Sequence, residues 1–100
     1  KTQPKQQQVT LHAILSFKKN NSIFTGDIYD SYKKTCARVG LRPLTQRRVS
    51  DIIGEMDMLG IINAKVISKG RFGRTREISL SIPATLVQKI SSVLEQSIGL

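Results

Sequence analysis

The sequence is poor in the residues from which most enzyme and metal sites are built. It has one cysteine, one histidine and no tryptophan. A lone cysteine forms no disulfide within the chain, and Cys36 and His12 together fall short of the four ligands typical of structural zinc. The seven acidic residues form no convincing catalytic pair. We therefore predict no catalytic residue, metal site or cofactor in this chain, and the single cysteine favours a reducing, intracellular compartment.

Long hydrophobic runs and acidic charge are also scarce. No stretch approaches the ~20 apolar residues of a membrane-spanning helix, and no signal-peptide pattern opens the chain. Sixteen lysines and arginines oppose seven acids, which gives a formal net charge of +9 and a pI near 10.2. This balance favours a polyanionic partner, and nucleic acid is preferred over the competing interpretation, an anionic membrane surface. We predict no membrane partner and a cytoplasmic, nucleoid-associated location.

The length of the chain predicts one small domain with a single aliphatic core. Lys1 is not an initiator methionine, so we expect a piece of a longer protein. Residues 1–8 are polar and contain a proline, which predicts a linker. Residues 9–100 are predicted to form the domain.

Helical spacing and capping residues divide the first part of the domain. Apolar residues recur at helical spacing over 9–19, and Ile23 and Phe24 favour a short strand. Thr25 is predicted to cap a second helix that ends at Gly40, and Cys36 lies on its apolar face as a buried small hydrophobe. Thr45 is predicted to cap a third helix that closes at residue 60. The predicted inward face of this third helix comprises Val49, Ile52, Ile53, Met56 and Leu59.

Two strands and a last helix follow. Residues 61–68 and 76–82 are rich in isoleucine and valine and flank a glycine-containing turn at 70–73, which predicts a β-hairpin. Pro83 then opens a helix that runs to about residue 97. The side chains predicted to face inward from this helix are Leu86, Ile90, Val93 and Leu94. The order of elements predicts an α+β fold, a winged helix-turn-helix with a three-helix core, a β-hairpin wing and an extra C-terminal helix.

The third helix carries its charges in an unusual order. Arg47 and Arg48 lie in its first turn and its acids come later, although the helix dipole prefers the reverse. An approaching phosphate or base edge explains this order, because recognition helices contact DNA from their N-terminal end. Gln46, Arg47 and Ser50 are candidates for base edges, and Arg48 for a base or a phosphate. The alternative is that both arginines pair with an acid one turn later. Thr45 is mainly a cap, with a backbone phosphate contact as an addition.

The segment 65–76 holds five positive charges and no negative one. Gly70 and Gly73 supply freedom at its turn, and a basic tip suits the narrow minor groove. We predict that Arg71 and Arg74 enter that groove. Phe72 either contacts a sugar or base or packs back on the wing, and a simply solvated loop is the alternative for the arginines. The cations predicted to follow the phosphates are Lys65, Lys69 and Arg76.

Two strings carry a family resemblance. The first is Thr45-Gln-Arg-Arg-Val-Ser-Asp-Ile-Ile-Gly-Glu-Met-Asp-Met-Leu-Gly-Ile-Ile, and the second is Lys69-Gly-Arg-Phe-Gly-Arg-Thr-Arg-Glu-Ile-Ser-Leu. The chain resembles, over roughly residues 9–97, the C-terminal winged-helix domain of archaeal Orc/Cdc-type replication initiators. The wing string is the more specific of the two.

The resemblance implies binding of double-stranded DNA at replication origins. It implies contacts from the third helix at Gln46, Arg47, Arg48 and Ser50, and from the wing at Arg71, Phe72, Gly73 and Arg74. In that family the domain follows an AAA+ ATPase module, so ATP and magnesium are expected only in that missing module. The implied partners are origin DNA and a replicative helicase or another initiator subunit, with the isolated domain monomeric. Fold and charge also permit a transcription regulator or a protein-docking module.

Overall fold

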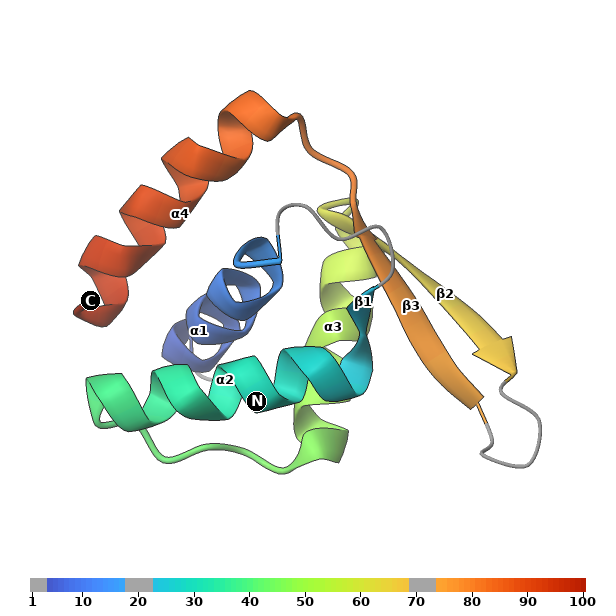
Figure 1. The fold of residues 1–100 in the computed structure, drawn as a ribbon, viewed down its shortest axis with the longest axis horizontal. Coiled ribbons are helices and arrows are strands. Elements are labelled where there is room, and N and C mark those ends of the chain that lie inside the picture. The colour runs from blue at the N-terminus through green and yellow to red at the C-terminus, as the bar shows by residue number, and fades with distance from the viewer. Residues whose placement is uncertain (1–3, 18–22, 69–73) are drawn as a thin grey trace.

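The computed structural model describes residues 4–17, 23–68 and 74–100. Its helices and strands follow one another in the order predicted for a winged helix-turn-helix. Figure 1 shows the hairpin of β2 and β3 extending away from the helices. In chain order they are α1 (Pro4–Leu15), β1 (Ile23–Phe24), α2 (Thr25–Val39), α3 (Gln46–Met58), β2 (Ile62–Ser68), β3 (Arg74–Leu80) and α4 (Ala84–Ile98). The predicted α+β winged-helix fold is confirmed.

The three strands form one antiparallel sheet in the order β1-β3-β2. Ile78 of β3 is paired with Ile23 on one side and with Ala64 on the other. Ile78 is buried and Ser79 is exposed, which confirms the alternation predicted for this strand. The second strand of the hairpin begins and ends two residues earlier than predicted, because β3 spans Arg74–Leu80, with Arg74 opposite Ser68. The sheet thus lies against the helices at one end and projects as a wing at the other (Figure 1).

The main core lies among α1, α2, α3 and the inner end of the sheet. Each helix turns one apolar stripe inward, because apolar residues three and four apart fall on one face. The fully buried members of this core include Val9, Ile14, Ile28, Tyr32, Ile52, Ile53, Ile62 and Ile78. A second, smaller cluster joins α4 to α1 through Leu15, Val87 and Leu94. Figure 1 shows α4 on the far side of α1 from α3.

The first helix differs from the prediction at both of its ends. We predicted a linker over 1–8 and a helix over 9–19, whereas α1 spans Pro4–Leu15. The linker prediction was wrong for residues 4–8, which are helical, and Gln6 among them is buried. A buried glutamine is satisfied by hydrogen bonds to distant parts of the chain, and apolar periodicity does not reveal such bonds. Proline is tolerated in the first helical turn, where its missing N–H has no partner in the helix.

Three caps were predicted, and two are confirmed. Gly40 ends α2 in the left-handed conformation with φ of 73°, and the hydroxyl of Thr45 accepts from the backbone N–H of Arg48 at 3.3 Å. The prediction of Thr25 as the N-cap of α2 was wrong by one residue, because Phe24 is the N-cap. The backbone N–H of Phe24 donates to the carboxylate of Asp27, in the first turn of α2, at 3.2 Å.

Some residues predicted to face inward are exposed. Leu59 lies just beyond the last turn of α3 and is 75% exposed. In α4, Leu94 is buried and Ile90 half-buried, as predicted, whereas Leu86 and Val93 are exposed. Val87 and Ile98 are buried in their place. The correct face of α4 is therefore offset from the predicted one. Helical spacing alone allowed both faces, since this helix is apolar on more than one side.

Candidate nucleic-acid interface

The N-terminal end of α3 is an exposed, positively charged helix terminus. Gln46, Arg47 and Arg48 are all exposed, whereas Val49 behind them is fully buried and holds the helix to the core. The first turn holds no acidic residue, so the arginine charges add to the positive end of the helix dipole. Three of the candidate base-contacting residues thus lie on open surface, and Ser50 is half-buried.

Two of the three acidic residues of α3 have partners elsewhere in the fold. The carboxylate of Asp57 accepts from the backbone N–H of Ala64 at 3.1 Å, and Glu55 accepts from the Gln7 side-chain amide at 3.2 Å. Among the residues that the structure describes, neither Arg47 nor Arg48 forms an ion pair with Asp51. The unusual charge order of α3 therefore has two origins: its later acids attach it to β2 and α1, and its early arginines stay available.

Hydrogen bonds from α1 and α2 hold the turn that leads into α3. The backbone N–H of Leu44 donates to the Tyr32 hydroxyl at 2.7 Å, and that hydroxyl donates to the side-chain oxygen of Gln6. The amide nitrogen of Gln6 donates to the Arg42 carbonyl at 3.0 Å, and the Tyr29 hydroxyl donates to the Leu44 carbonyl at 2.9 Å. These bonds, which we call the turn clamp, were not predicted, and the only signal for them was polar side chains at otherwise inward positions.

The centre of the turn clamp is shielded from water. Tyr32 has no exposed surface, and its ring stacks on that of Tyr29 with centroids 5.9 Å apart. Burial raises the pKa of Tyr32 to about 12, although the hydrogen bond from Leu44 acts in the opposite direction. Burial also raises the pKa of the Cys36 thiol, which fits the prediction of a buried small hydrophobe. The clamp is thus uncharged at neutral pH.

The structure describes the two strands of the wing, β2 and β3. Lys69, Arg71, Phe72 and Gly73 lie outside the described residues, so the predictions for the wing tip remain predictions. Arg74 is the first residue of β3. Lys65 is exposed on β2, opposite Glu77 of β3. The described strands β2 and β3 lie on one side of α3 (Figure 1).

Arg76 has an environment that the sequence did not predict. Its guanidinium Nη1 donates to the backbone carbonyl of Ser50 in α3 at 2.8 Å, and its side chain is half-buried. The predicted phosphate contact of Arg76 stays a prediction, but the structure adds a contact to the third helix. A signal for it existed in the sequence: Ser50 and Gly54 are small residues one helical turn apart, and such a pair lets another chain segment approach closely.

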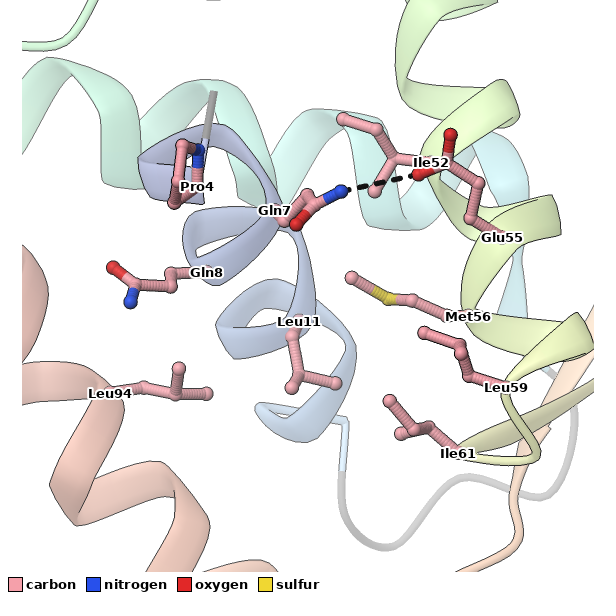
Figure 2. A pocket seen from close by; sticks show the side chains of 10 residues that line it. All are labelled: Pro4, Gln7, Gln8, Leu11, Ile52, Glu55, Met56, Leu59, Ile61 and Leu94. Atoms are coloured by element: carbon pink, nitrogen blue, oxygen red, sulfur yellow. Dashed lines mark hydrogen bonds between the residues drawn. The ribbon is translucent and has the colours of Figure 1, made fainter. Parts of the chain in front are cut away.

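A pocket of about 250 Å³ lies at the other end of α3 (Figure 2). Apolar side chains from α1, α3, α4 and the turn before β2 line most of it, among them Leu11, Met56 and Leu94. Its polar groups include the Gln7 amide and the Glu55 carboxylate, which are already hydrogen-bonded to each other. The pocket brings together no nucleophile with a base, so its geometry suggests no reaction.

Other chemistries find no support in the described residues. No group of three histidines, cysteines or acids is placed to hold a metal ion in residues 4–17, 23–68 and 74–100. His12 is 13% exposed, and its Nε2 lies 3.1 Å from the Glu95 carboxylate, so it joins α1 to α4. In the same ranges, no helix has the length and hydropathy needed to cross a membrane.

Comparison with known families supplies an independent view. The family described as "CDC6, C terminal winged helix domain" matches residues 1–90. The chain is also similar to the ORC1-type DNA replication protein of Thermococcus onnurineus, with 53% identity over 92 residues. That alignment covers 90% of this chain and 22% of the relative. The chain therefore spans about a fifth of the length of this curated relative.

Two solved structures share the fold. The Orc1 protein of Aeropyrum pernix, solved in complex with DNA, superposes with a TM-score of 0.76 and 38% identity, over 92% of this chain and 24% of that one. Cdc6p from Pyrobaculum aerophilum superposes with a TM-score of 0.73 over 96% of this chain and 25% of that one. At 21% identity, the second likeness shows the fold alone.

Proposed function

The chain belongs to the family of CDC6 C-terminal winged-helix domains, and from this membership we propose that it binds double-stranded DNA at replication origins as the C-terminal module of a replication initiator. Its similarity to an Orc1 protein solved in complex with DNA supports the partner. The ATPase of the proposed parent protein lies outside this chain, and with it the ATP and magnesium site that the resemblance implies.

The exposed, cationic start of α3 is the observation that carries the proposal. Arg47 and Arg48 have no acidic partner in the described residues, and the turn clamp fixes the helix end that bears them. In our proposal this end enters the major groove, which is ~12 Å wide and admits a helix. Gln46, Arg47 and Ser50 meet base edges there, and Arg48 meets a base or a phosphate.

The wing completes the proposed interface. The hydrogen bond from Arg76 of β3 to the Ser50 carbonyl of α3 supports this, because it brings the described strands next to the helix. We propose that Arg71 and Arg74 enter this groove, and that Lys65 and Lys69 follow the phosphates. Arginine suits a narrow minor groove because the negative potential is enhanced there.

Salt-dependent binding tests the proposal. A domain that contacts about five phosphates releases counterions, so log K falls against log salt with a slope of roughly −4 to −5. We expect this slope when the domain is titrated into fluorescent origin-derived and scrambled duplexes at several salt concentrations. Preference for the origin duplex assigns sequence recognition to this domain. Equal affinity for both duplexes contradicts origin recognition by this domain.

Two matched charge reversals locate the interface. Arg47→Glu and Lys89→Glu each lower the net charge by two, and both side chains are exposed, but Lys89 lies on α4, beyond α1 from α3. We expect at least tenfold weaker binding for Arg47→Glu, because a base or phosphate contact becomes repulsive, and less than threefold for Lys89→Glu. Equal losses would contradict the proposed face. Salt-independent binding, or none, would favour docking of a protein such as a helicase.

A further inference from the structure

We propose that Arg76 is a positioning residue that fixes the orientation of the wing relative to α3, so that both elements meet DNA in one arrangement. This role rests on the proposed DNA binding. It differs from the phosphate contact predicted from the sequence, because it requires the guanidinium to face the protein and not the nucleic acid.

The contact itself joins two elements that are distant in the chain. Nη1 of Arg76 in β3 donates to the Ser50 carbonyl in α3 at 2.8 Å. In a helix that carbonyl also accepts from the N–H four residues later, and a carbonyl oxygen has two lone pairs for two donors. A hydrogen bond from a charged guanidinium is stronger than one between neutral groups. The partner is backbone, so the bond marks a fixed point on α3.

The surface of α3 is shaped to receive this side chain. A Cβ added at Gly54 would lie 3.4 Å from Nη1 and 3.9 Å from Nη2 of Arg76. Apart from the backbone of α3 itself, it would meet no other described group within 4 Å. The guanidinium therefore lies against bare helix backbone, in contact distance of the position that a side chain would occupy. Larger side chains at this position would push the wing outward.

The inner part of the hairpin is held in several ways. Ile62 and Ile78 are buried, β1 pairs with β3 as far as Glu77, and the Ala64 backbone donates to Asp57. Arg76 lies one residue beyond the β1 pairing, and its partner Val66 is two residues further toward the hairpin tip than Ala64. Val66 is 56% exposed, so apolar packing contributes little to holding this outer part. Arg76 is thus the outermost hydrogen bond between the described hairpin and α3, and it fixes the direction of the outer wing.

A distance measurement without DNA tests the orientation directly. Spin labels at Asp51→Cys on α3 and Val66→Cys on β2 occupy exposed positions, and Val66 lies opposite Arg76, beyond the Ala64 attachment. The native Cys36 is buried. We expect a narrow distance distribution in the otherwise unchanged protein and a clearly broader one after Arg76→Met, with partial narrowing in Arg76→Lys, which keeps a donor. An unchanged distribution in Arg76→Met would overturn the proposal, whatever the protein does with DNA.

Binding measurements then separate positioning from a phosphate contact. Arg76→Met and the control Lys65→Met remove the same charge and add the same side chain. For Arg76→Met we expect about tenfold weaker binding with an unchanged salt slope, because the freed wing loses its mobility on binding but makes the same phosphate contacts. A slope about 0.9 shallower would identify Arg76 as a phosphate ligand and overturn the positioning role.

Thermal unfolding of the same variants excludes a purely structural effect. If Arg76 only stabilised the fold, Arg76→Met would lower Tm but bind DNA normally well below that temperature, and this outcome would overturn the proposal. If the unsubstituted domain binds no duplex at any salt, the proposed function fails. The spin-label result then still decides whether Arg76 orients the wing.

Discussion

The two sides of α3 are attached to the rest of the molecule in different ways. At its N-terminal end, the turn clamp joins the preceding turn to α1 and α2 through the buried hydroxyl of Tyr32 and the buried side chain of Gln6. On its wing side, Ile62 and Ile78 pack in the core with α3, and the polar attachments are the half-buried Arg76 and Asp57. The turn before the helix end proposed to read DNA is therefore held by buried polar groups, whereas the hydrogen bonds between α3 and the wing come from half-buried ones.

This difference has a physical basis. A buried polar group that loses its partner finds no water to replace it, so removing the partner costs about 1–3 kcal/mol. A half-exposed group exchanges its partner for water at much smaller cost. A small domain can thus hold the turn before one DNA-contacting element through buried hydrogen bonds and orient the other element through half-buried ones.

The largest expected effect comes from opening the turn clamp. Tyr32→Phe keeps the ring but leaves the Gln6 oxygen and the Leu44 N–H without their partner. We expect a loss of about 2–3 kcal/mol in the free energy of unfolding, measured by urea titration. Tyr29→Phe is the matched control, because the Tyr29 hydroxyl is only partly buried and donates a single bond, to the Leu44 carbonyl. Equal losses would contradict a special role for burial at Tyr32.

Alkaline pH acts on the same hydroxyl without mutation. The folded pKa of Tyr32 is about 12 and the ordinary value is 10.0, so above pH 10 the unfolded chain releases this proton first. Stability contributed by the neutral hydroxyl is complete below pH 10 and is lost as pH rises toward 12. By pH 11.5 we expect a loss of about 2 kcal/mol.

Urea titrations between pH 9 and 11.5 measure this loss. The difference between the unsubstituted protein and Tyr32→Phe isolates it, because other groups titrate in both. The stability gap between the two should narrow as pH rises. A gap that stays constant would show that Tyr32 titrates normally in the folded domain.

The smallest expected effect concerns the wing side. Gly54→Ala replaces the poorest ordinary helix former by the best and should raise the free energy of unfolding by about 0.5–1 kcal/mol. The new Cβ would lie in ordinary van der Waals contact with Arg76, at 3.4 Å from Nη1, so no clash cancels the gain in stability. Thermal and urea unfolding measure the change. A loss of stability would show that the Arg76 contact tolerates less than the distance suggests and that the wing side is the more rigid one.

Most of the fold was predictable because its signals are local. The caps at Gly40 and Thr45 and the alternation around Ile78 each depend on residues within a few positions, and all three were confirmed. The errors came where local signals were ambiguous. The glutamine-rich start of α1 reads as a polar linker, and α4 offers two apolar faces of which only packing selects one.

The candidate site divides in the same way. The exposed positions of Gln46, Arg47 and Arg48 follow from the N-cap and the helical period, so the sequence placed them correctly on an open helix end. The spacing of Ser50 and Gly54 marks a place on α3 where another segment can approach, but it does not identify Arg76 as that segment, and the contacts of Asp57 and Gln6 have no spacing signal. Each of these side chains is polar, and nothing in its neighbours distinguishes a solvated group from one bonded to another element.

The sequence by itself thus determined the order of helices and strands, the charge and the helix end that carries it, since periodicity, capping and composition act over short distances. Tertiary structure alone decided which polar side chains hold the fold together. The Arg76–Ser50 and Tyr32–Gln6 bonds each span 26 residues, and Gln6–Arg42 spans 36. Bonds across such separations form only after apolar burial has brought the elements together, because closing loops of that length without packing is entropically unfavourable.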